Sequence, residues 1–324
     1  MSKPLLIVIT PVRNEAWCLE AFLSHCSMWA DYIIIADQNS TDGSREIAER
    51  FEKVILVNNT SEEMHQAEAR RILFNQVDKI VGDKIVFALD ADEFLSVNFE
   101  KTEGWYKILN SKPNSIFCFK WHNLYNDFNT ALPEIKNHME WACHFSRESK
   151  MELLYCEVEN RAVHEMRIPC VADAEYINID EIKFVHLGLL NLERSNNKRD
   201  FYQVSTVSKL PKRISAVTIF RTYNQPIKTI NTQDSLLDKD IQTMIKLDDV
   251  GLHYIEEMIA VFNREGIEKF IKLDIWDNKY LKNAGISCRK PYHIKLLHWY
   301  LRKTKNICSK LPIGILDKLF KRIV

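Results

Sequence analysis

Four short apolar runs recur through the first hundred residues and constrain the fold more than any other feature. Residues 5–10, 32–37, 54–58 and 84–89 read LLIVIT, YIIIAD, VILVN and KIVFAL. Runs of this length that are rich in branched side chains are typical of strands buried on both faces. The segments between them have helical apolar spacing. Strands alternating with helices predict an α/β fold with a doubly wound, mainly parallel sheet flanked by helices.

Polar side chains gather where these runs end. In doubly wound sheets, ligands bind beyond the carboxyl ends of the strands. Asp90 and Asp92 follow the fourth run and are separated only by Ala91. Two carboxylates with this spacing can converge on one divalent cation, with substrate phosphate oxygens completing its shell. A single D-x-D is more often an acidic turn, but other polar residues lie at the ends of the first two runs: Arg13, Asn14, Glu15 and Asp37.

Three segments carry a resemblance to a known family. They are PVRNEA at 11–16, ADQNSTDGS at 36–44 and ALDADEF at 88–94. In this order and spacing they resemble the family 2 glycosyltransferases of the GT-A fold, over roughly residues 5–95. Those enzymes move a sugar from a nucleotide donor to an acceptor.

The resemblance implies roles for individual residues. Asp37 matches the residue that reads the nucleobase, usually uracil, and Glu15 matches one beside the ribose. Asp90 matches a carboxylate near the ribose or a metal-bound water, and Asp92 matches the direct ligand of Mn²⁺ or Mg²⁺. Pro11 and Arg13 belong to the same donor-binding run.

The second segment departs from the family pattern. Gln38 and Asn39 stand where the family has Asp and Gly. Since Asn tolerates a positive φ nearly as Gly does, we expect the turn to survive. In the helix that follows the third run, the resemblance places a basic residue near the diphosphate. Arg71 is our candidate beside its neighbour Arg70, and the alternative is a solvated helix face.

Residues 100–190 are less regular. The aromatic-rich segments 115–125 and 140–147 are expected to form strands. V-H-E at 163–165, followed by His186, is similar to a branch of family 2 that includes bacterial lipopolysaccharide-core glucosyltransferases. An inverting transferase needs a base to deprotonate the acceptor hydroxyl, and Glu165 is the candidate. The alternative for Glu165 is a salt bridge to Arg161 or Arg167.

His186 follows a short apolar run, IKFV. An imidazole there can bind the metal or touch the diphosphate, or it can be a core histidine with satisfied hydrogen bonds. The predicted division of the chain is a catalytic domain at 1–190, with a nucleotide-sugar half (1–99) and an acceptor half (100–190). A C-terminal helical region follows at 191–324.

The end of the chain is basic. Residues 289–324 contain ten Lys and Arg but one acid, Asp317, although the chain as a whole has no net charge. Apolar and aromatic residues are interleaved with them, as in helices that lie on anionic membrane surfaces. A helix packed on the catalytic domain with a solvated basic face is the alternative. The balanced overall charge gives no reason to expect nucleic-acid binding.

Eight cysteines without a C-x-x-C pair predict reduced, mostly buried thiols. The N-terminal apolar run is short for a signal peptide, and no run is long enough to span a membrane. We therefore expect a cytoplasmic protein, which is peripheral on the inner face of the cell membrane if the basic tail binds lipid and not if the tail packs on the catalytic domain.

The expected function is a metal-dependent, inverting glycosyltransferase that uses a nucleotide-diphosphate sugar, with a UDP-sugar favoured. Its acceptor would be a glycan or lipid-linked precursor in surface polysaccharide synthesis. A sugar-1-phosphate nucleotidyltransferase is one alternative, but it would need a Gly-rich phosphate loop after the first strand. The first glycine here is Gly43. The other alternative is a non-catalytic scaffold that keeps the fold and sits on the membrane.

Overall fold

The computed structural model describes residues 3–60, 66–134, 138–149, 167–169, 171, 173–209, 214–232, 234–305 and 317–318. Contacts divide the chain into two units. The first contains Met1–Leu190 and Thr229–Leu247, and the second contains Asn191–Lys228 and Asp248–Val324. The return of residues 229–247 to the first unit was not part of the division predicted from the sequence.

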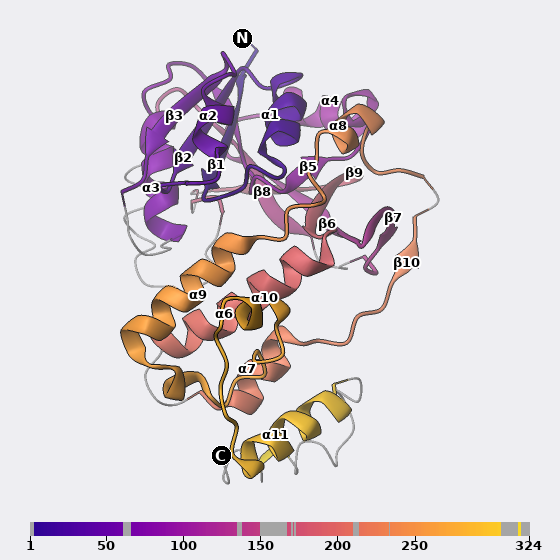
Figure 1. Cartoon of the computed structure of the whole chain (residues 1–324). Coiled ribbons are helices and arrows are strands. Elements are labelled where there is room, and N and C mark those ends of the chain that lie inside the picture. Colours follow the sequence, from indigo (N-terminus) through magenta and orange to yellow (C-terminus); the bar gives the residue numbers. More distant parts are fainter. Residues whose placement is uncertain are drawn as a thin grey trace. The chain divides into compact units, whose positions relative to one another are not determined.

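The first unit is built on four parallel strands (Figure 1). They lie in the order β4 (Lys84–Ala88), β1 (Leu5–Val12), β2 (Tyr32–Asp37) and β3 (Val54–Asn58). These are the four predicted runs, so that prediction is confirmed. Val12 pairs with Asp37 across β1 and β2. The residues that follow β1 and β2 therefore begin at the same edge of the sheet.

Antiparallel strands extend the sheet beyond β4. They are β8 (Met139–Phe145), β6 (Ser115–Tyr125), β7 (Asp127–Ala131) and β10 (Ile230–Asn231). Strand β9 (Glu175–Leu189) runs parallel to β6 and antiparallel to the short β5 (Glu93–Leu95). In this pairing His186 lies opposite Glu93. The result is a mixed, mostly parallel sheet.

Helices cover both faces of the parallel strands (Figure 1). Because successive side chains on a strand point to opposite faces, Leu6 and Val8 belong to one core and Ile7 and Ile9 to another. The first core takes in α1 (Leu19–Ser27), α2 (Ser44–Ala48), η1 (Phe99–Lys101) and α4 (Glu103–Leu109). The second takes in α3 (Gln66–Val77). Helices on both faces are the arrangement expected from the sequence.

The described part of the second unit is helical. Its elements are α6 (Leu192–Lys209), α7 (Ala216–Tyr223), α9 (Leu252–Glu265), η2 (Ile267–Phe270), α10 (Lys279–Asn283) and α11 (Tyr292–Lys303). Two separate helices follow residue 234: α8 (Lys239–Thr243) lies in the first unit and α9 in the second. Gly251, with a φ of 69°, separates them.

Two smaller expectations concern thiols and membranes. Cys18, Cys26, Cys118 and Cys143 are free and buried, and Cys288 is free and half-buried, as the sequence predicts. Among the helices in the described ranges, none has the length and apolar character needed to cross a bilayer.

Candidate active site

The loops after β1 and β2 are locked to each other. Three backbone N–H groups of the first loop donate to side chains of the second: Asn14 to Ser40 (3.0 Å), Glu15 to Ser44 (2.9 Å) and Ala16 to Asp42 (2.9 Å). In return, the Thr41 N–H donates to Asn14 Oδ1 at 2.8 Å. Several residues of the segments 11–16 and 36–44 therefore hold the two loops together. We had not predicted this pairing, although Ser, Thr and Asp commonly bond to nearby backbone groups.

Two asparagines give these loops their shape. Asn14 has a φ of 57° and Asn39 a φ of 51°. Both values lie in the left-handed region, which Asn reaches more easily than most residues because its side chain can hydrogen-bond locally. The expectation that Asn39 preserves the turn in place of Gly is confirmed.

Asp37 is the last residue of β2, and one oxygen of its carboxylate is available as a hydrogen-bond acceptor. Its side chain is 4% exposed, and Oδ2 lies 3.5 Å from Nη1 of Arg45. Its Oδ1 is buried and has no hydrogen-bond partner within the described residues. An unsatisfied buried acceptor is costly, so this atom suits a ligand N–H group.

The other residues expected to bind the donor lie along the same edge. Pro11 pairs with Ala36 near the end of β1, and half-buried Arg13 follows that strand. Glu15 accepts a hydrogen bond from Trp17 Nε1 at 2.6 Å through Oε2. The indole therefore orients this carboxylate.

Asp90 faces two guanidinium groups. Its Oδ2 accepts a hydrogen bond from Arg167 Nη2 at 2.8 Å, and its Oδ1 lies 3.8 Å from Arg70 Nη2. Opposite charges this close attract each other. The first carboxylate of the D-A-D segment is thus surrounded by protein cations.

Glu93 is the buried anchor of this cluster. Its carboxylate is fully buried and accepts hydrogen bonds from the Asp90 N–H (2.9 Å), Trp141 Nε1 (3.3 Å) and Arg167 Nη1 (2.5 Å). Burial raises the pKa of the Glu93 carboxyl, and the facing Arg167 opposes that shift. Glu93 therefore holds the Asp90 backbone and the side chains of Trp141 and Arg167 in place from the protein interior. We had not predicted the role of Arg167, which lies on a segment with no distinctive local pattern.

Asp92 and His186 come together although they are far apart in the sequence. His186 Nε2 lies 3.3 Å from Asp92 Oδ2, and His186 Nδ1 lies 2.6 Å from Asn123 Oδ1. With Nδ1 donating its hydrogen to the amide oxygen, Nε2 can offer a lone pair to a cation. Adjacent ligands of an octahedral ion with bonds of about 2.1 Å are about 3 Å apart, so the two atoms fit one ion.

The fit is limited to this pair. Within the described ranges, no group of three or more His, Cys, Asp and Glu side chains is placed to hold a metal. A cation held by Asp92 and His186 would keep most of its coordination positions for oxygen atoms from a substrate or from water, as Mg²⁺ commonly does.

Arg70, rather than Arg71, lies beside Asp90. Arg71 is half-exposed and pairs with Glu68 on the same helix at 2.7 Å. The Arg70 side chain is only 4% exposed, and its Nε and Nη1 atoms have no partner among the described residues. A buried guanidinium with unused donors suits an anionic ligand such as a phosphate.

Glu165 lies outside the described residues, as does Arg161. Arg167, the other partner considered for Glu165, bonds to Asp90 and Glu93.

Comparison with known proteins agrees with this arrangement. Residues 7–152 match the model of the glycosyl transferase family 2. This segment contains the interlocked loops, Asp37 and the D-A-D segment. Residues 7–152 therefore represent a family 2 domain, and the protein is a glycosyltransferase.

Similarity to individual proteins is low. No curated protein matches the chain. Among solved structures, a Mycobacterium tuberculosis glucosyl-3-phosphoglycerate synthase is 16% identical, with a TM-score of 0.26 over 38% of this chain and 44% of that one. GalNAc-T7 is 12% identical, with a TM-score of 0.39 over 69% and 55%. An inositol-1-phosphate CTP transferase from T. maritima is 8% identical, with a TM-score of 0.37 over 77% and 98%.

Proposed function

We propose that the protein is a metal-dependent, inverting glycosyltransferase that uses a nucleotide-diphosphate sugar, specifically a UDP-sugar. The proposed acceptor is a glycan or lipid-linked precursor in surface polysaccharide synthesis. The family 2 domain supports the reaction class. The observation that carries the metal-dependent form is the pair formed by Asp92 and His186, whose ligand atoms lie 3.3 Å apart beside Asp90.

The donor is proposed to lie along the edge formed by the ends of β1, β2 and β4. The unsatisfied Asp37 Oδ1 accepts a hydrogen bond from the nucleobase. Glu15, oriented by Trp17, accepts one from the ribose. Pro11 and Arg13 line the same edge, and Arg70 takes the place beside the diphosphate that the sequence suggested for Arg71.

Asp92 and His186 are the proposed ligands of Mn²⁺ or Mg²⁺, and Asn123 holds the imidazole in the required orientation. The bound ion would stabilise negative charge on the leaving diphosphate. Asp90, which accepts a hydrogen bond from Arg167, would accept another from the ribose or from a water bound to the ion.

Glu165 is the proposed general base. It would take the proton of the acceptor hydroxyl while that oxygen bonds to the anomeric carbon and the bond to the diphosphate breaks. Displacement from the opposite face inverts the anomeric configuration. Glu93 does not suit this role, because it is fully buried and already paired with Arg167.

Isothermal titration calorimetry with UDP, with and without Mn²⁺, tests the donor and metal assignments. We expect Mn²⁺ to strengthen UDP binding to the wild type and not to Asp92→Asn. Asp83→Asn is the matched control. Asp83 lies just before the amino end of β4, whereas Asp92 follows the carboxyl end, and Asp83 accepts a hydrogen bond from the Arg147 N–H. Unchanged metal dependence in Asp92→Asn would remove Asp92 from the metal site.

A product assay separates glycosyl transfer from nucleotidyl transfer. Incubation with UDP-sugars and glycan acceptors should release UDP, and the anomeric configuration of the product should be inverted by NMR. Release of pyrophosphate from UTP and a sugar 1-phosphate would instead identify a nucleotidyltransferase.

A further inference from the structure

Helix α11 exposes an apolar stripe although its opposite face is well packed. Ile294, Leu297 and Leu301 are buried, and the last two pack in a cluster with residues of α7. Outward-facing Tyr292, Leu296 and Trp299 are 81%, 43% and 59% exposed. Their spacing of four and three residues places them on one side of the helix. The second unit therefore presents aromatic and aliphatic side chains to its surroundings.

Positive charge flanks this stripe. Residues 289–305 contain six Lys and Arg and no Asp or Glu, in a chain with no net charge. Lys295 and Lys303 are exposed, and neither forms an ion pair within the described residues. Since repulsion between like charges is not offset within the helix, the face is complementary to a negatively charged partner.

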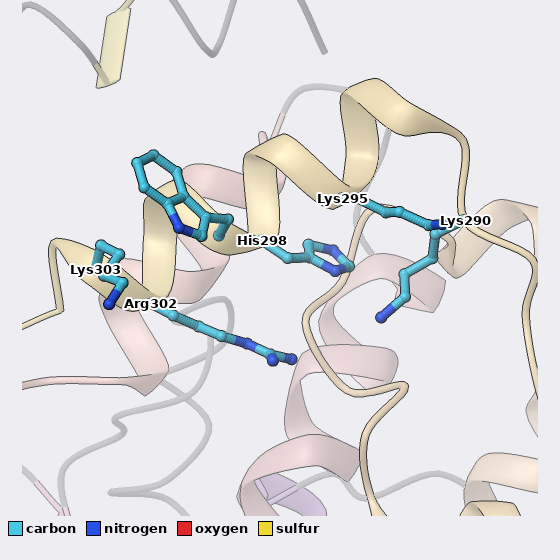
Figure 2. Close-up of a pocket in the computed structure, with 6 residues that line it drawn as sticks. Lys290, Lys295, His298, Arg302 and Lys303 are labelled. Carbon is cyan, nitrogen blue, oxygen red and sulfur yellow. The ribbon is translucent and has the colours of Figure 1, made fainter.

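Figure 2 shows the side chains that line a hollow beside α11. Its volume is about 260 Å³, and it is lined by Lys290, Lys295, His298, Trp299, Arg302 and Lys303. Arg302 is already engaged, because its guanidinium donates to Asp274 at 2.7 Å and to Asp277 at 2.5 Å. The lysines are therefore the groups available to an anion from outside.

We propose that this face of α11 docks the protein on an anionic lipid bilayer. Trp and Tyr side chains settle at the boundary between headgroups and acyl chains, where an aromatic ring and a polar group are both accommodated. Lysines on the same face meet the lipid phosphates. An exposed aromatic stripe between lysines, with no acid among them, matches both layers of such a surface at once.

This docking surface deepens the proposed function and rests on it for its purpose. A lipid-linked acceptor is confined to the membrane plane, so an enzyme held on that plane meets it more often. The stripe and its lysines lie in the second unit, whereas every residue assigned to the donor and the metal lies in the first. Docking and donor binding can therefore be tested separately.

The test is co-sedimentation of the full-length protein with vesicles. We expect binding to phosphatidylcholine vesicles that contain phosphatidylglycerol, little binding to pure phosphatidylcholine, and loss of binding at high salt. Because each lysine near such a surface contributes about fivefold in affinity, Lys295→Gln/Lys303→Gln should weaken binding roughly 25-fold. Trp299→Ala should also weaken vesicle binding, because it removes an apolar contact, and this loss should depend less on salt than the loss in the lysine variant.

The control variant Lys101→Gln/Lys107→Gln removes the same charge from the first unit and should bind as the wild type does. All substituted residues are exposed, so circular dichroism should show unchanged folding. Equal binding of the α11 variants and the wild type, or a full-length protein that stays in solution with anionic vesicles, would overturn the proposal. Asp92→Asn should still bind vesicles, so failure of the metal assignment and failure of docking give different results.

Discussion

The candidate active site and the outward face of α11 handle charge in opposite ways. In the first unit, Glu93 is fully buried and bonded to Arg167, whose side chain is 14% exposed. On α11, Lys295 and Lys303 are exposed and have no ion-pair partner within the described residues. Buried pairs fix geometry and are little affected by salt, whereas exposed charges act over a distance of about 8 Å and are screened. The first arrangement suits chemistry, and the second suits attachment to a surface.

The largest expected effect separates these two tasks. Glu165→Gln should lower turnover by roughly 10²–10⁴-fold, the usual contribution of a general base, because Gln cannot accept the acceptor proton. Affinity for UDP and for anionic vesicles should remain unchanged. Steady-state kinetics together with calorimetry and co-sedimentation would measure all three. A variant that turns over at the wild-type rate would place the base elsewhere.

The buried pair should show its importance in stability. Glu93→Gln removes the charge that Arg167 and its neighbours surround, and loss of one partner from a buried ion pair destabilises by about 3–5 kcal/mol. Chemical denaturation measures this change. Glu100→Gln, at an exposed carboxylate of the same unit, should stay within about 0.5 kcal/mol of the wild type. If the two variants unfold at the same denaturant concentration, Glu93 does not anchor the cluster.

Neighbouring arginines of α3 offer a matched comparison within one helix. Arg70→Met should weaken UDP binding by about 1.5–3 kcal/mol, the range for hydrogen bonds to charged groups. Arg71→Met should change it by less than about 0.5 kcal/mol, because Arg71 is half-exposed and paired with Glu68. Calorimetry at fixed salt compares them. A larger loss in Arg71→Met would return the diphosphate role to that residue.

The choice between these arginines could have been made from the sequence. Leu73, Phe74 and Val77 face the buried core, and Arg70 lies three and four residues before the first two of them. Helical spacing therefore places Arg70 on the inward side and rotates Arg71 about 100° away. The four parallel strands were predictable for a similar reason, because each is a local apolar pattern.

Other parts of the site depend on contacts that no local pattern contains. The pairing of Asp92 with His186 requires β9 to lie beside β5 in one register, with His186 opposite Glu93. Arg167 reaches Asp90 and Glu93 from a segment far along the chain. Strand registers between distant segments are set by the assembled sheet, so single-sequence reasoning named Asp92 and His186 separately and considered Arg167 only as a salt-bridge partner of Glu165.

The smallest expected effect concerns His25, a buried histidine whose Nε2 has no hydrogen-bond partner among the described residues. His25 packs between Phe94 and Phe99, and burial lowers the pKa of His25 from 6.5 to about 4, although Asp238 opposes the shift. Above pH 6.5 the imidazole is neutral in both the folded and the unfolded chain and has no effect. Below pH 6.5 only the unfolded chain gains the proton, so stability falls by about 1.4 kcal/mol per pH unit and levels off below about pH 4. The loss at pH 5 should be roughly 2 kcal/mol.

His25→Phe should remove this part of the slope when denaturation is measured between pH 7 and pH 5, and exposed His293→Gln should keep it. Parallel slopes for His25→Phe and the wild type would show that His25 is not held neutral by burial, and that the contrast between buried and exposed charge does not extend to this side chain.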